Sequence, residues 1–140
     1  MKLHAEPLTI RQLGQFLQNV RDADIYEAEL ASGCSFIDNP LVYFYSTLAV
    51  VDDTGRVFAI GGITDSVVWM LCTKCVEEHK ITFLKYSKKL LQETLSHFPY
   101  LYNKCWLGNG LHVKWLSWLG CTWGKQEGDF RYFRFTKGDH

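Results

Sequence analysis

Arg21, Asp24 and Glu29 are the residues near the start of the chain whose types and spacing suit acid–base chemistry. Asp24 and Glu29 fall within one predicted helix and Arg21 directly precedes it, so that a carboxylate can act there as a general base and a guanidinium can anchor an anion. His112, much later in the chain, is a second candidate base or hydrogen-bond donor. An ordinary solvated helix face and a half-buried structural histidine explain the same residues, so both interpretations stay open. We take Glu29 and His112 as the candidate catalytic residues.

Three cysteines raise the question of a metal site. Cys72 and Cys75 are separated by two residues, and Cys105 lies on a later predicted strand. A zinc site would need a second Cys or His pair at matching spacing, which the sequence lacks. The chain has five cysteines in all, an odd count that is typical of free thiols in a reducing compartment. We predict no metal site.

Basic and aromatic residues suggest two further kinds of binding surface. Lys85, Lys88 and Lys89 form a basic stripe that could bind RNA or another single-stranded nucleic acid, although a solvated helix face gives the same pattern. Aromatic residues crowd the end of the chain: Trp123, Phe130, Tyr132, Phe133 and Phe135. We assign the buried ones to the core, and interpret any that stay exposed as a protein interface.

Length and composition indicate a globular protein. The 140 residues are 47% hydrophobic and 21% charged, and Lys plus Arg equals Asp plus Glu. A formal net charge of zero argues against a broadly cationic nucleic-acid-binding protein. The first residues lack the long apolar run of a signal peptide, and the apolar stretches are too short to span a membrane. We expect a cytosolic protein.

The elements that must position these residues follow from the apolar periodicity. Thr9 is a predicted helix N-cap, and Gly33 is a predicted helix stop. The apolar run 67–72 is typical of a central strand, and the helix after it ends before Pro99. We predict strands over residues 3–8, 41–51, 56–64, 67–72, 102–107, 121–125 and 130–136, and helices over 10–20, 22–31, 79–98 and 109–119. The order β-α-α-β-β-β-α-β-α-β-β predicts a single α/β domain over residues 1–140.

That order, together with scattered motif residues, resembles a known family. Asn109 and, eleven positions later, Gly120 are similar to the last helix of the GNAT (Gcn5-related N-acetyltransferase) fold. A wider set resembles the phage GNAT-like family that includes internal virion protein A of short-tailed phages. The set comprises Arg21, Asp24, Glu29, Gly33, Trp69-Met70-Leu71, Thr73, Glu78-His79, Phe83-Leu84, Pro99-Tyr100-Leu101, Asn103, Trp115-Leu116 and Leu119-Gly120. The resemblance implies a mixed, mostly antiparallel sheet flanked by helices.

The same resemblance implies a site for acetyl-coenzyme A after the central strand, where a Gly-rich turn holds the pyrophosphate in GNAT enzymes. The cofactor-binding positions that it implies are Leu71, Cys72, Thr73, Lys74, Lys80, Asn109 and Trp115. Residues 73–80 contain no glycine, and Glu77 and Glu78 add negative charge there. Leu116 stands where many family enzymes have a tyrosine that protonates the leaving thiolate. Acetyl-coenzyme A remains a candidate cofactor that these departures argue against.

Three functions are compatible with the sequence. The first is a divergent acyltransferase scaffold that binds another phage or host protein during virion assembly or infection, either packaged in the virion or only assisting its assembly. The second is an active N-acetyltransferase that uses acetyl-coenzyme A and an amine acceptor. The third is an inhibitor of a host protein or defence system. The resemblance, the glycine-free turn and Leu116 favour the first.

Overall fold

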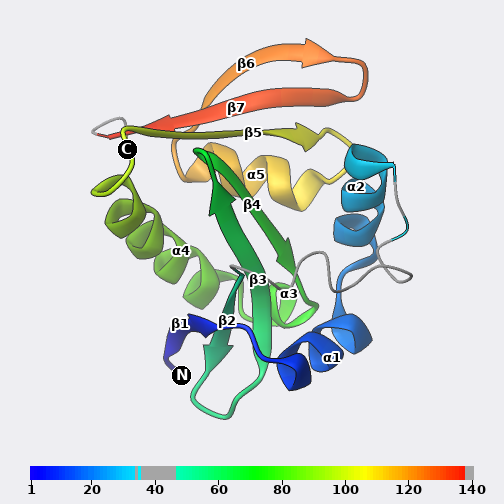
Figure 1. Cartoon of the computed structure of the whole chain (residues 1–140), viewed down its shortest axis with the longest axis vertical. Helices are drawn as coiled ribbons and strands as arrows, with labels where there is room; N and C mark the ends of the chain where they lie inside the picture. The colour runs from blue at the N-terminus through cyan, green and yellow to red at the C-terminus, as the bar shows by residue number, and fades with distance from the viewer. Residues whose placement is uncertain (34, 36–46, 138–140) are drawn as a thin grey trace. The chain divides into compact units, whose positions relative to one another are not determined.

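The computed structural model describes residues 1–33, 35 and 47–137 (Figure 1). The element order is that of the predicted α/β fold with one short helix added. In chain order the elements are β1 (Leu3–Pro7), α1 (Ile10–Asn19), α2 (Asp22–Ser32), β2 (Leu48–Asp52), β3 (Val57–Thr64), β4 (Val67–Cys72), α3 (Cys75–Glu78), α4 (Lys80–Leu95), β5 (Tyr100–Trp106), α5 (Gly110–Trp118), β6 (Thr122–Glu127) and β7 (Phe130–Thr136). No helix among the described residues is long and apolar enough to cross a membrane.

The strands pair in the order β1-β2-β3-β4-β5-β7-β6. Pairing is antiparallel for β1 with β2, β2 with β3, β5 with β7 and β6 with β7, and parallel for β4 with β5. The sheet is therefore mixed and mostly antiparallel, as predicted, and β4 stands fourth in the order.

Two compact units make up the chain. The first holds Met1–Ile63 and Trp69–Phe83, and the second holds Thr64–Val68 and Leu84–His140. Because β4 and α4 contribute residues to both, the single domain expected from the sequence stays a prediction.

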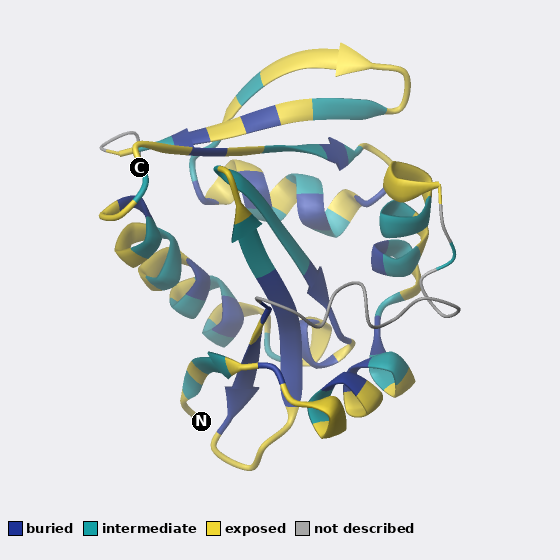
Figure 2. Cartoon of the chain, viewed as in Figure 1, coloured by how far each residue is buried: buried dark blue, intermediate teal, exposed yellow. Residues whose placement is uncertain are grey.

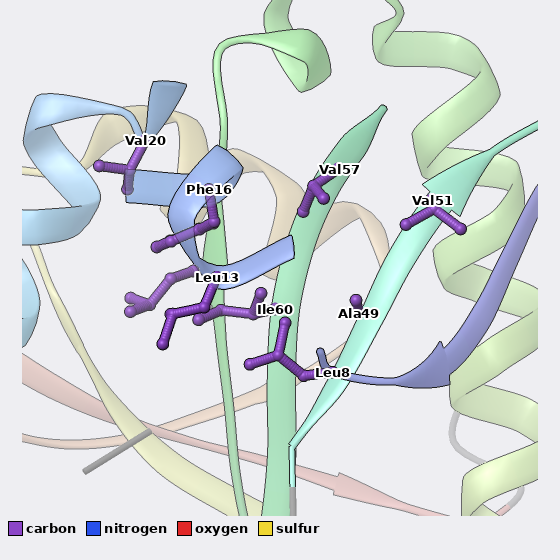
Figure 3. Close-up of a cluster of buried hydrophobic side chains, with 9 residues drawn as sticks. Leu8, Leu13, Phe16, Val20, Ala49, Val51, Val57 and Ile60 are labelled. Atoms are coloured by element: carbon purple, nitrogen blue, oxygen red, sulfur yellow. The ribbon is translucent and has the colours of Figure 1, made fainter. Parts of the chain in front are cut away.

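In the first unit, α1 packs its apolar side on β2 and β3. Leu13 and Phe16 of α1 meet Ala49 and Ile60 of the strands in one buried cluster (Figure 3). The helix begins as predicted, because the Thr9 side chain accepts from the Gln12 amide while the Gln12 side chain accepts from the Thr9 amide. Val20, directly after α1, and Leu71 of β4 belong to the same cluster, and Ile25 and Ala28 of α2 pack against it.

In the second unit, β5 and β7 pair over their whole length, from Tyr100↔Thr136 to Trp106↔Phe130. Side chains alternate along both strands, which Figure 2 shows as alternating buried and exposed bands on β7. One side of the pair is core: Leu101, Cys105, Phe133 and Phe135 are buried. The Trp123 indole of β6 donates to the Ser117 hydroxyl of α5, which attaches this helix to the strands.

Some predicted boundaries differ from the structure. Helix α4 ends at Leu95 and not at residue 98, because the amides of Ser96 and His97 turn back to carbonyls three residues earlier. β5 begins at Tyr100, two residues earlier than predicted. β4 is buried only at Leu71 and Cys72, so the prediction of a strand covered on both faces holds for its end alone. Residues 41–46 of the predicted strand 41–51, and Cys34, lie outside the described residues.

Candidate functional site

The turn between β4 and α4, residues 73–80, is the place where the sequence predicts a cofactor, and it lies wholly within the first unit. It contains the helix α3 (Cys75–Glu78), which the sequence did not predict. The backbone N–H groups of Thr73, Lys74, Cys75, Val76, Glu77 and His79 all donate to acceptors inside the chain. These six amides are therefore already used by the fold.

Thr73 is a buried residue that attaches this turn to β3. Its side chain is fully buried, and its hydroxyl lies 2.8 Å from the Val57 carbonyl oxygen and 3.2 Å from that of Phe58. The same hydroxyl oxygen accepts from the Cys75 amide. These contacts anchor the turn to β3, so Thr73 acts here as a structural residue of the first unit.

Arg21 connects α2 to the same turn. Its guanidinium donates to Asp24 through Nη1 and to Glu77 through Nε, the latter at 2.9 Å. Asp24 is completely buried and its second oxygen accepts from the Cys72 amide. The Arg21 amide donates in turn to the Cys72 carbonyl. A carboxylate, a guanidinium and a second carboxylate thus form one chain of contacts between α2, the end of β4 and α3.

The electrostatics of this chain follow from its burial. Burial by itself lowers the pKa of Arg21, but the Glu77 hydrogen bond and the Asp24 charge outweigh it, so the pKa is raised and the guanidinium stays charged. Burial raises the pKa of the Cys72 thiol well above its ordinary value, and the Asp24 carboxylate raises it further. Cys72 is therefore a neutral, inert thiol.

The predicted residues of the first unit fall into two groups. Leu71, Cys72 and Thr73 are buried and packed, whereas Lys74 and Lys80 are exposed. Glu29 lies on α2 with its side chain half-buried, one helical turn before the Gly33 cap whose amide bonds the Glu29 carbonyl. The structure places Thr73, Lys74 and Lys80 in one turn, while the cofactor-binding roles of these residues and the catalytic role of Glu29 stay predictions.

The other predicted residues belong to the second unit. Asn109 is buried and caps α5, its side-chain oxygen accepting from the His112 amide at 3.5 Å. His112 is buried too, and its ring lies 5.6 Å from the Trp115 ring. Leu116, at the position of the family tyrosine, is buried and apolar. Asn109 therefore positions α5, while the chemical roles assigned to His112 and Trp115 stay predictions.

Sequence reasoning missed the Arg21–Glu77 contact and the helix α3. Arg21 and Asp24 lie three residues apart, and that spacing is the only local signal of the cluster. Glu77 lies 56 residues from Arg21, so no periodicity of the sequence connects them. A four-residue helix likewise has too few turns to show a helical period.

A phosphate of coenzyme A would need free backbone N–H groups and positive charge at this turn. Six of the turn amides donate within the chain, and two exposed carboxylates, Glu77 and Glu78, face the solvent there. Lys74 and Lys80 supply the opposite charge. On these contacts the turn is a poor match for a pyrophosphate.

Comparison with known sequences identifies a phage family. The family model for bacteriophage T7, probable scaffold protein Gp13, matches residues 47–127. The probable scaffold protein gp13 of Escherichia phage T7 is 28% identical over 95 residues. That alignment covers 60% of this chain and 66% of the relative, just under two thirds of its length.

Comparison with solved structures identifies the fold. The PaiA N-acetyltransferase of Thermoplasma acidophilum, solved in complex with coenzyme A, matches with a TM-score of 0.66 and 11% identity, over 97% of this chain and 99% of that one. A GNAT-family acetyltransferase from Bacillus anthracis matches with a TM-score of 0.72 and 8% identity, over 97% and 95%. Apo YjaB from Escherichia coli matches with a TM-score of 0.65 and 10% identity, over 100% of both chains. The chain has the GNAT fold, as the sequence resemblance predicted.

Proposed function

Because the chain belongs to the family of the probable scaffold protein Gp13 of bacteriophage T7, we propose that it is a GNAT-fold scaffold for phage particle assembly. In this proposal the protein acts by binding another phage protein in the infected cell, and it transfers no acyl group. The family description supports the assembly role. The chain shares its fold with the acetyltransferases, but its identity to them is too low to imply the same activity.

The observation that carries the proposal is the closed turn after β4. Six of its amides donate inside the chain, and Glu77 is held by Arg21, which leaves fewer groups of the turn for a phosphate. Leu116 adds to this, since an alkyl side chain cannot protonate a thiolate leaving group. In this proposal the chain has lost both the anion site and the general acid of the transferase chemistry.

The test is a phage in which this gene carries an amber codon. In a non-suppressing host we expect a large loss of infectious titre, and particles depleted in at least one other phage protein by mass spectrometry. A suppressing host is the control for the genetic background. Normal titre together with normal particle composition would contradict an assembly role.

A rescue experiment separates assembly from catalysis. Plasmid copies of the wild-type gene and of a Lys74→Glu, Lys80→Glu variant are compared in the non-suppressing host. Both lysines are exposed, so the variant should fold, and its reversed charges should repel a pyrophosphate. A non-catalytic scaffold predicts equal rescue by both copies, whereas failure of the variant alone would favour a cofactor site.

The alternative is an active N-acetyltransferase. The coenzyme A complex of the Thermoplasma acidophilum structure favours it, since that protein shares this fold. The exposed Lys74 and Lys80 would then contact the phosphates, with Glu29 or His112 as base. Acetylation of amines by the purified protein, measured as coenzyme A release, would establish this function over the scaffold.

A further inference from the structure

The outer face of β5 and β7, in the second unit, is a surface that the proposed function does not use. The register places Tyr102 opposite Arg134 and Lys104 opposite Tyr132. Directly opposite residues of an antiparallel pair point to the same side, so these four share one face. The neighbouring residues of both strands, such as Leu101 and Phe135, are buried on the other side.

Aromatic rings on this face remain accessible. Tyr100 is 42% exposed, and Tyr102 and Tyr132 are each 36% exposed. The rings of Tyr100 and Tyr102 lie 6.0 Å apart between centroids, and Lys104 Nζ lies 5.0 Å from the Phe130 ring centroid. We call this surface, made of Tyr100, Tyr102, Lys104, Phe130, Tyr132 and Arg134, the outer aromatic face.

The charge of the outer aromatic face is positive at its centre. Lys104 and Arg134 each lie directly across from a tyrosine, and the outward residues of β5 and β7 include no carboxylate. Glu127 lies at one end, on β6 opposite Phe130. Its hydrogen bond with the Tyr132 phenol raises the pKa of that phenol, which therefore stays neutral.

We propose that the outer aromatic face binds single-stranded nucleic acid. Bases stack on exposed aromatic rings whatever their identity, and a positively charged surface beside the rings holds the phosphate backbone. Alternating tyrosine and cation across two adjacent strands provides both at the spacing of cross-strand neighbours. This proposal does not depend on the scaffold function, because it concerns a different surface.

A protein partner fits this face less well. The centre of a protein–protein interface is depleted in charged residues, and lysine in particular is rare there. Here Lys104 lies within β5, directly opposite Tyr132, and not at an end of the strand. The protein interface expected from the exposed C-terminal aromatics is therefore the rival outcome of the test.

The test is fluorescence anisotropy with a labelled oligodeoxythymidine of about 20 nucleotides, which exceeds the site of one small binding domain. At salt on the order of 50 mM, we expect Tyr102→Ala to weaken binding about tenfold. The Lys104→Gln, Arg134→Gln variant changes no core residue, so its folding is secure. It should reduce the slope of log affinity against log salt by about 1.4, because each phosphate that is no longer neutralised reduces the slope by about 0.7.

Two further variants test whether the position and the sign of the charges on the face affect binding. Lys85→Gln, Lys89→Gln removes the same charge from exposed positions on α4 and should leave the affinity within about twofold. Glu127→Gln removes the carboxylate at the end of the face and should raise the affinity by about twofold or more.

Absence of binding at about 100 μM protein, far above the expected micromolar affinity, would overturn the proposal. Equal losses of affinity in the face and α4 variants would overturn it too, because they would indicate non-specific charge. If Tyr102→Ala abolished binding to a phage protein while no oligonucleotide bound, the face would belong to a protein partner and the proposal would again be overturned.

Discussion

The turn after β4 in the first unit and the outer aromatic face in the second both combine charged residues with a folded backbone, but they use the charges differently. In the turn, Arg21 lies between Asp24 and Glu77, and its side chain is only 11% exposed. On the outer aromatic face, Lys104 and Arg134 lie beside accessible rings. The charges of the turn stabilise the fold, whereas those of the face remain available to a partner.

This difference shows where function can be sought in a chain whose fold is that of an enzyme family. A polar group that already has its partner inside the chain gains little from a ligand, because binding would exchange one contact for another. An exposed group on a strand gives up no contact inside the chain when it binds a ligand. The contacts of the charged residues in the turn and on the outer aromatic face therefore say more about the function of this chain than its GNAT fold does.

The largest expected effect separates the two sides of β7. Phe133 is buried and packs edge-on against Trp123 and Phe135, so Phe133→Ala should cost about 3–5 kcal/mol of unfolding free energy. Tyr132→Ala, one residue away on the outer face, should cost less than about 1 kcal/mol. Urea unfolding followed by circular dichroism measures both, and equal losses would contradict the assignment of the two sides.

A second large effect concerns the buried carboxylate of the turn. Asp24→Asn keeps the shape but removes the charge that Arg21 and the Cys72 amide contact, which should cost about 3 kcal/mol of unfolding free energy. Asp22→Asn, on the same helix and exposed, is the matched control and should change stability by less than about 0.5 kcal/mol. If Asp24→Asn proved as mild as its control, the turn would not be held by this contact.

A pH-dependent effect tests whether the Asp52 carboxylate stabilises the turn between β2 and β3 through its contacts with Thr54 and Arg56. Burial would raise the pKa of Asp52, but hydrogen bonds from Thr54 and Arg56 lower it to about 2. A depressed folded-state pKa gives stability that is present above the unfolded value near 3.8 and is lost as pH falls towards 2.

We therefore expect Asp52→Asn to cost about 1–2 kcal/mol at neutral pH, since the partner Arg56 is 45% exposed and partly screened. The difference in unfolding free energy between wild type and variant should shrink towards zero as pH falls from about 4 to about 2. Unfolding curves across this range measure it. A difference that stayed constant with pH would show that the carboxylate charge does not stabilise the turn.

The smallest expected effect is at the exposed end of the Asp24–Arg21–Glu77 chain of contacts. The Glu77 side chain is 48% exposed, so Glu77→Gln should cost less than about 1 kcal/mol while Arg21 keeps Asp24. Glu78→Gln on the same turn is the control, with an expected change near zero. A loss above about 2 kcal/mol for Glu77→Gln would mean that the outer ion pair is as important as the buried one.

Local signals accounted for most of the fold in advance. Thr9 and Gly33 mark helix ends through their own side chain or backbone, with Gly33 at a φ of 72° that favours glycine. The sequence predicted the strand 130–136 that contains Phe133 and Phe135, but it did not say which aromatics would stay exposed. That depended on the register with β5, which sets Tyr132 opposite Lys104.

The candidate site was less accessible to sequence reasoning. The family resemblance led to residues 73–80, and the absence of glycine there was visible directly. The contacts that close the turn join residues 48 and 56 positions apart, from Cys72 to Asp24 and from Glu77 to Arg21. Such pairs follow from the tertiary packing of α2 beside β4, which no local pattern encodes.

The most direct test of the closed turn is calorimetric titration of the purified protein with acetyl-coenzyme A and with coenzyme A. We predict no binding heat at ligand concentrations up to about 1 mM, both for wild type and for a Glu77→Gln, Glu78→Gln variant, because the turn amides stay engaged in either protein. Binding of either ligand at micromolar strength by the wild-type protein would contradict the closed turn and restore the transferase as the leading function.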